Sequence, residues 1–193
     1  MPFLPLPESA AYRHIEAREG FEVVFMSQGA ESIRFEGQTS ALEGGYAWSV
    51  DYVIELTPDW LTRRARISNL TAEGRRELLL ESDLGGSWRV NGEPAPHLEG
   101  LLDVDIESSA VTNAIPVHRT ALEIGGAADA PAVYVRAQDL AVMRLEQRYE
   151  RRPDGGRAQR YAYTALAFDA YFVLVYDDSG LVTNYPGLAV RVL

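Results

Sequence analysis

The amino-acid sequence predicts a mainly antiparallel β protein, either a sandwich or a barrel-like fold. Apolar and polar residues alternate along most of the chain, about ten segments have the composition of strands, and only one short segment favours a helix. A sheet with so many strands has to close, split or curl in order to bury its apolar face and protect its edges. No linker or repeat divides the 193 residues, so we expect a single domain over residues 1–193.

The first half of the chain contains strands that are rich in aromatic and β-branched residues. They are expected at residues 21–26, 32–36, 47–56, 60–68, 75–81 and 87–90. Thr57-Pro58-Asp59 separates two of these strands and predicts a hairpin there. Asn91-Gly92 ends the last strand, and this dipeptide readily takes the positive φ values of a tight turn.

The second half continues the same pattern. Its strands are expected at residues 132–137, 141–151, 158–168, 171–176 and 188–192. The segment 141–151 also fits a helix capped by Asp139, but its alternation of polar and apolar residues favours a strand. The strand at 171–176 is apolar on both faces, so we expect it to be covered on both sides.

One short helix is expected at residues 108–114. Ser108 or Ser109 would cap its first turn, and Pro116 would end it because proline interrupts a helix interior. The side chain of Asn113 would then cap the helix end and bond nearby backbone groups.

Charge and composition limit the classes of partner. A formal net charge of −10 repels phosphate backbones, so we expect no nucleic-acid partner. No apolar run approaches the about 20 residues of a membrane span, which argues against an integral membrane protein. The N-terminus lacks the basic segment of a secretory signal, and we therefore expect a cytoplasmic protein. The absence of cysteine excludes disulfides and thiolate chemistry.

Asp103, Asp105 and His118 are the candidates for catalysis. On a strand, the two aspartates would point to one face about 7 Å apart, which a divalent cation could bridge with further ligands. No third ligand follows from the local spacing, and no nucleophile elbow, metalloprotease motif or phosphate loop accompanies His118. We therefore favour a structural role for all three residues, and we expect neither a metal nor a cofactor.

Other polar residues could contact a ligand. Gln147 shares a predicted face with Met143, Leu145 and Tyr149, and a buried amide costs about 1–3 kcal/mol if it is left unpaired. It would therefore bond the backbone or face a ligand. Arg119 could clamp an anionic head group, although arginines between apolar residues more often lie on solvated sheet faces. The 10 tyrosines suit the wall of an amphipathic cavity, and also ordinary packing.

The second half of the chain carries a recognisable pattern. Its most specific parts are Thr112-Asn113 followed by Ile115-Pro116 and Arg119, the run Leu145-Glu146-Gln147-Arg148-Tyr149, and Gly180-Leu181-Val182 through Tyr185-Pro186-Gly187-Leu188. These motifs resemble the putative glycolipid-binding family of bacterial proteins. Ala189 and His118 depart from that pattern, because the family typically has tryptophan and arginine at these two positions.

The resemblance implies a fold and a site. The fold would be a single, strongly curved antiparallel sheet that forms an unclosed barrel with one or two short helices, similar to the periplasmic lipoprotein carriers. Its concave apolar face would suit acyl chains. The expected ligand-binding residues are Asn113, Arg119, Gln147, Tyr149 and Tyr185, and Pro116 and Pro186 would lie at the rim or in the framework.

These observations favour a function in binding. We expect non-catalytic binding of a glycolipid or another amphipathic molecule in a concave face that the protein's own side chains do not fill completely. Each buried methylene of such a ligand gains about 0.8 kcal/mol. The alternatives are a hydrolase or transferase that uses Asp103, Asp105 and His118, and a module that takes up a peptide at a strand edge or in the concave face.

Overall fold

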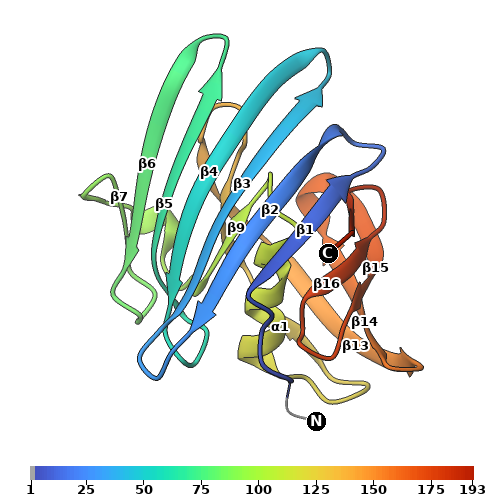
Figure 1. Ribbon diagram of the computed structural model, residues 1–193. Coiled ribbons are helices and arrows are strands. Elements are labelled where there is room, and N and C mark those ends of the chain that lie inside the picture. The colour runs from blue at the N-terminus through green and yellow to red at the C-terminus, as the bar shows by residue number, and fades with distance from the viewer. Residues whose placement is uncertain (1–2) are drawn as a thin grey trace.

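Fourteen strands form one continuous, strongly bent sheet in the computed structural model, which describes residues 3–193 (Figure 1). In spatial order they are β10 (Ala127–Asp129), β13 (Gln147–Gly155), β14 (Ala158–Ala165), β15 (Ala170–Tyr176), β16 (Val182–Tyr185), β17 (Ala189–Arg191), β1 (Ser9–His14), β2 (Glu19–Gln28), β3 (Ile33–Glu43), β4 (Tyr46–Leu56), β5 (Thr62–Thr71), β6 (Gly74–Ser82), β7 (Trp88–Val90) and β8 (Glu93–Pro94). Neighbouring strands are antiparallel throughout, and β10 and β8 are not joined to each other. The expected unclosed antiparallel barrel is confirmed.

The predicted alternation places one face of each long strand toward the core. In β4, Trp48, Val50 and Tyr52 are buried, whereas the residues between them are partly exposed. Gly37 of β3 lies opposite Tyr52, whose ring occupies the space that a Cβ atom at position 37 would need. Glycine at this position therefore allows the tyrosine to lie flat over the neighbouring strand.

The inner side of the bend is largely filled by the protein itself. A second sheet contains β12 (Val142–Leu145), β11 (Ala132–Val135) and β9 (Asp103–Ile106). The 3₁₀ turn η2 (Val111–Asn113) leads into the helix α1 (Ala114–Thr120), and Figure 1 shows α1 and β9 between the two arms of the large sheet. β9 and β11 run parallel, which the sequence did not predict.

The helix begins later than expected. Pro116 is the third residue of α1 rather than the residue that ends a helix over 108–114. Proline is tolerated in the first turn, because its missing N–H would have no partner within the helix there. The side chain of Asn113 does not cap this helix, and the helix ends at Thr120, before Ala121, which has a left-handed conformation.

Several strand boundaries also differ from the prediction. The expected strand at 141–151 is indeed extended, but it is broken at Glu146 into β12 and β13, which belong to different sheets. The expected strand at 158–168 ends at Ala165, where the 3₁₀ turn η3 (Leu166–Phe168) begins. The strands β1, β10 and β16 were not predicted, because they are short or carry polar residues at inward positions.

The expected cover on both faces of β15 is found on one face only. Leu174 and Tyr176 are buried, whereas Tyr171 is 61% exposed, and Val173 and Val175 are partly exposed. The outward face of this strand therefore remains in contact with solvent. The turn at Asn91-Gly92 is confirmed, because both residues have positive φ values, 52° and 84°.

No helix among residues 3–193 combines the length and the apolar character that crossing a bilayer requires.

Candidate functional site

A cavity of about 270 Å³ remains on the inner side of the bent sheet, between β14–β16, the small sheet and the loop after β1. We call it the inner cavity. Five aromatic side chains lie in its wall: Tyr134, Tyr163, Phe168, Phe172 and Tyr185. The rings of Tyr163 and Phe172 each pack edge-on against Tyr185, with centroids 5.9 and 5.7 Å apart. The cavity therefore has an aromatic wall suited to apolar or sugar-like surfaces.

Five polar side chains also line the inner cavity, beside several aliphatic residues. They are Arg18, Asp105, Glu107, Ser109 and Asn113. They come from the loop between β1 and β2, from β9, and from the segment that leads into α1. The cavity thus combines aromatic surface with both hydrogen-bond donors and acceptors, which is the composition expected for an amphipathic ligand.

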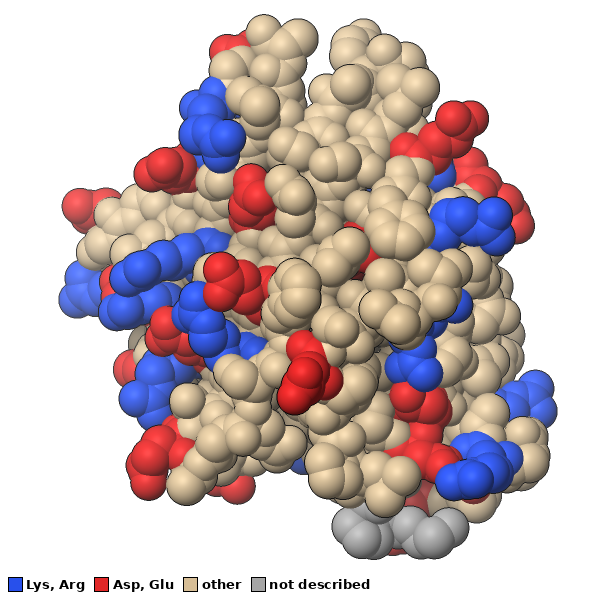
Figure 2. Space-filling model, viewed as in Figure 1, with Lys and Arg blue, Asp and Glu red and all other residues tan. Residues whose placement is uncertain are grey.

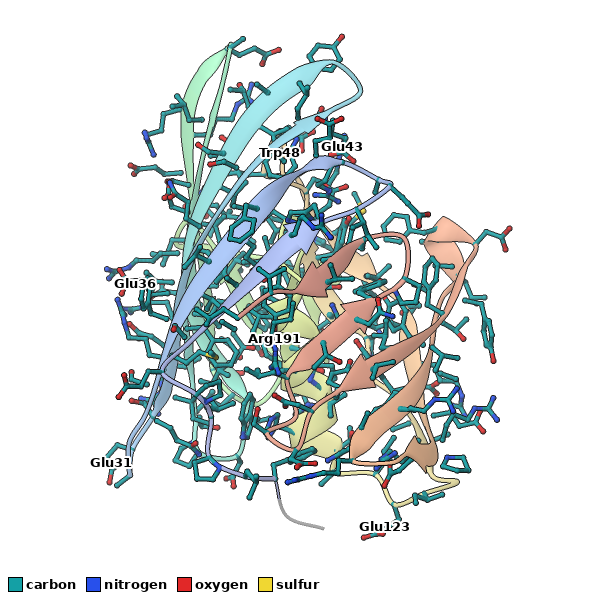
Figure 3. The ribbon with its side chains drawn as sticks, turned by 45° about the vertical axis from the view of Figure 1, so that its right-hand side comes forward. Glu31, Glu36, Glu43, Trp48, Glu123 and Arg191 are labelled. Carbon is teal, nitrogen blue, oxygen red and sulfur yellow. The ribbon has the colours of Figure 1, made fainter. Side chains whose placement is uncertain are left out.

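Arg18 is the polar residue with the fewest partners. Its side chain is only 4% exposed, and its Nε and Nη1 atoms have no hydrogen-bond acceptor. The guanidinium lies 5.3 Å from the ring centre of Trp48, and its Nε is 3.9 Å from Glu43 Oε1, beyond hydrogen-bond distance. Figure 3 shows Trp48 and Glu43 near each other at the upper end of the sheet. A buried guanidinium without an acceptor is costly, so Arg18 is suited to bind an oxygen-bearing group.

Asp105 also lines the inner cavity. Its Oδ1 accepts a hydrogen bond of 2.8 Å from the hydroxyl of Thr112. Burial raises the pKa of Asp105 to about 6, because a charged carboxylate loses its hydration there, and the neighbouring Asp103 and Glu107 add to this effect. The carboxyl group therefore loses its proton near pH 6, well above the pH at which an exposed aspartate does so.

Three of the predicted ligand-binding residues come together beside this carboxylate. Tyr149 donates a hydrogen bond of 2.8 Å to Asn113 Oδ1, and its ring packs against Tyr163 at 5.1 Å. Tyr163 in turn contacts Tyr185, so Asn113, Tyr149 and Tyr185 belong to one cluster, in which Asn113 and Tyr185 line the inner cavity and Tyr149 lies behind them. Burial raises the pKa of the Tyr149 and Tyr163 hydroxyls, so both act as neutral donors or acceptors.

The structure places the other two predicted residues differently. Gln147 is buried on the same inward face as Tyr149, and its Oε1 has no partner, but it does not line the inner cavity. Arg119 binds Asp103 through two hydrogen bonds of 2.7 Å, and these bonds raise the pKa of the guanidinium. As contacts to a ligand, all five predicted residues stay predictions.

The three candidates for catalysis have separate partners. Asp103 is fully buried with Arg119, and Asp105 is bound by Thr112. His118 stacks on Trp60 at 3.7 Å, packs against Phe3 at 4.1 Å, and lies 3.0 Å from the carbonyl oxygen of Ser179 through Nε2.

The environment of His118 keeps it neutral, because burial lowers its pKa to about 4. The residues that the structure describes contain no group of three or more histidine, aspartate or glutamate side chains placed to hold a metal ion. Asp103 and Asp105 are both buried and do not lie on a half-exposed strand, because all four residues of β9, the edge strand of the small sheet next to β11, are buried.

Sequence reasoning missed Arg18, Tyr163 and Phe172. The alternation in β14 and β15 indicates that Tyr163 and Phe172 point inward, and the two residues are paired across the strands. Nothing local distinguishes Arg18 from the other arginines, because its burial depends on Trp48, which lies 30 positions away.

A larger but shallower depression of about 980 Å³ crosses the outer face of β2–β6, and we call it the outer groove. It combines apolar side chains such as Phe25 and Val53 with the charged Glu36, Asp51 and Arg66. Figure 2 shows that acidic and basic side chains are interspersed over the visible face of the molecule. The outer groove has no buried polar group without a partner, so the inner cavity is the better candidate within residues 3–193.

Comparisons with known proteins agree with the resemblance inferred from the motifs. A crystal structure of a DUF1089 family protein from Pseudomonas aeruginosa is similar, with a TM-score of 0.76 and 30% sequence identity over 89% of this chain and 92% of that chain. The search of curated proteins found no match. The model of the family described as putative glycolipid-binding matches residues 10–191. The chain therefore belongs to the putative glycolipid-binding family.

Proposed function

We propose that this protein binds a glycolipid or a similar amphipathic molecule in the inner cavity, without chemical conversion of the ligand. The observation that carries the proposal is the wall of this cavity, which aromatic rings share with Arg18, Asp105 and Asn113. Aromatic faces bind sugar rings or alkyl chains, and the polar groups bind hydroxyls or charged atoms. The family assignment supports a binding role in general.

The size of the cavity indicates which part of the ligand enters. At about 270 Å³, the cavity is smaller than the roughly 300–1,000 Å³ of sites that enclose a whole drug-sized ligand. Phe168 lines the cavity but is 52% exposed, and the nearby Leu166 is 80% exposed, so an apolar surface continues from the cavity to the outside of the protein. We infer that the head group and the first part of the chain are enclosed, and that the remaining chain lies against η3.

Catalysis by Asp103, Asp105 and His118 has less support. General acid–base catalysis needs groups within hydrogen-bond reach of the same reacting atoms. Asp103 forms an ion pair with Arg119, and His118 is enclosed by Phe3 and Trp60 with its Nε2 at Ser179. Of the three, only Asp105 lines the inner cavity.

Two measurements test the proposal. Native mass spectrometry of the protein from its producing cell should show a bound amphiphile, and titration with dodecyl glucoside below its micelle concentration should saturate. Ala170→Trp, which fills the inner cavity from its partly exposed edge, should weaken this binding at least about tenfold, because the added ring displaces the ligand.

The matched control is Val53→Trp, which places the same ring in the outer groove. We expect this variant to bind dodecyl glucoside like the parent. If Val53→Trp abolishes binding and Ala170→Trp does not, the ligand lies in the outer groove. If no amphiphile binds the parent protein, the proposal is wrong.

A further inference from the structure

We propose that the inner cavity selects amphiphiles with an acidic head group, a carboxylate or a phosphate, and that Arg18 binds this oxyanion. The inference rests on the proposed function, because it specifies the head group of the ligand in the same cavity. Its basis is a buried cation with no counter-ion at hydrogen-bond distance.

The surroundings of Arg18 give its Nε and Nη1 atoms no acceptor at hydrogen-bond distance. Glu43 is the acidic residue placed nearest to the guanidinium, and it stays 3.9 Å from Nε. Trp48 faces the guanidinium with its ring, which attracts a cation but accepts no strong hydrogen bond. His14, which also lies close, is held neutral because burial and Arg18 lower its pKa to about 4.

The acidic groups around the cavity, in contrast, already have donors. Glu22 accepts hydrogen bonds from Tyr52, Ser109 and the backbone N–H of Ala110. Glu107 accepts a hydrogen bond of 2.7 Å from the backbone N–H of Ala137, and Asp105 is bound by Thr112. Arg18 therefore lacks a hydrogen-bond acceptor, whereas each of these carboxylates already has a hydrogen-bond donor.

An oxyanion meets this requirement best. A guanidinium presents parallel N–H groups that match the two oxygens of a carboxylate or phosphate, and charge-assisted hydrogen bonds are about twice as strong as neutral ones. Asn113 uses its oxygen for Tyr149, so its amide nitrogen remains as a further donor in the cavity wall. The aromatic rings that line the same cavity would contact the first part of the alkyl chain.

The inference is tested by titrating the parent protein with dodecanoate, dodecyl phosphate, dodecanol and dodecyl glucoside. We expect the two acids to bind about tenfold or more tightly than dodecanol, because a hydrogen bond to a charged group is worth at least one tenfold step. Inorganic phosphate is included to separate a lipid head group from a free anion, and it should bind far more weakly than dodecyl phosphate.

Arg18→Gln should weaken binding of both acids about tenfold or more and leave dodecyl glucoside unaffected. Arg18→Lys retains the charge but not the planar fork, so we expect an intermediate affinity. Arg13→Gln replaces an exposed arginine of β1 that does not line the cavity, and it should bind every probe like the parent.

The melting temperature of the ligand-free protein distinguishes an arginine that binds a ligand from one that stabilises the fold. Because Arg18 is buried without an acceptor, Arg18→Gln should raise the melting temperature of the ligand-free protein, whereas loss of a structural contact would lower it. A lowered melting temperature together with equal loss of affinity for all probes would overturn the inference.

The remaining outcomes separate the inference from the proposed function. If dodecyl glucoside binds and the acids bind no better than dodecanol, the inference is wrong and the proposed function stands. If inorganic phosphate binds as tightly as dodecyl phosphate, the site serves a free anion and the inference is wrong. If none of the amphiphiles binds the parent protein, the proposed function fails and the inference fails with it.

Discussion

Two ionisable side chains of opposite charge, Arg18 and Asp105, are buried in the wall of the inner cavity. Burial of a charge without full compensation lowers stability, so neither residue improves the packing of the fold. The Nε and Nη1 atoms of Arg18 have no acceptor, and Asp105 accepts a hydrogen bond from the hydroxyl of Thr112. Such groups are characteristic of functional sites, where a ligand supplies the missing interactions.

Asp105→Asn should make the protein more stable at neutral and alkaline pH. The folded-state pKa of Asp105 is raised from 3.8 to about 6, so the folded state binds the proton more tightly than the unfolded state. The free energy of unfolding therefore falls as the pH rises through this window, and the full penalty, about 2–3 kcal/mol, applies above it. Asparagine removes this penalty and retains an acceptor for Thr112.

Urea unfolding of the parent and of Asp105→Asn at about pH 4 and about pH 8 measures this effect. The variant should gain stability at the higher pH and little at the lower pH. The exposed Asp59→Asn serves as the control and should differ little from the parent at both values. A difference between Asp105→Asn and the parent that is independent of pH would contradict the prediction.

The helix α1 is joined to β9 by the ion pair between Arg119 and Asp103. Two hydrogen bonds of 2.7 Å make the pair bidentate, and Asp103 is completely buried while the Arg119 side chain is 17% exposed. The pair lies where the small sheet meets the helix, so it positions the segment that carries Thr112 and Asn113. This placement indicates a structural role for Arg119.

Removing one partner of this pair should lower the free energy of unfolding much more than removing both partners. Arg119→Met leaves a buried carboxylate without a counter-ion and should lower the free energy of unfolding by about 3–5 kcal/mol, as measured by urea unfolding. In the background of Asp103→Asn, the same change should cost far less. If the Arg119→Met variant is as stable as the parent but binds dodecyl glucoside more weakly, Arg119 contacts the ligand, as the sequence predicts.

The sequence predicted the strands better than the helix. The period-2 pattern of segments such as residues 47–56 survives in the structure, because it only requires one apolar face toward the core. The predicted helix lies too early in the chain, because a proline is as compatible with the first turn of a helix as with the end of one, and Pro116 lies in the first turn of α1. Short strands such as β16 depend on neighbours that are distant in the sequence, so local patterns do not reveal them.

The first and last strands of the chain meet in the middle of the large sheet. β1 pairs with β2 on one side and with β17 on the other, with Tyr12 opposite Arg191 and His14 opposite Ala189. Arg191 also forms an ion pair of 2.6 Å with Asp177, which follows β15. The two arms of the bent sheet are thus joined through β1, β17 and β16, next to the loop that carries Arg18.

Truncation tests this role of the last strand. Removing residues 187–193 deletes β17 and exposes the hydrogen-bonding edges of β1 and β16, so we expect the cooperative urea transition to weaken or disappear. Removing Leu193 alone, which is 71% exposed, should have a much smaller effect. If the longer truncation unfolds like the parent, the two arms do not depend on β17.

The chain's pattern of apolar and polar residues determined the β class, the inward faces of the long strands and, through its motifs, the family. Only the tertiary structure decided which side chains share the inner cavity, because Arg18 and Tyr163 lie far in the sequence from Asp105 and Asn113 and from each other. Their meeting depends on the bend of the large sheet and on the position of the small sheet inside it. Burial, which isolates Arg18 and raises the pKa of Asp105, is a property of that packing and not of local sequence.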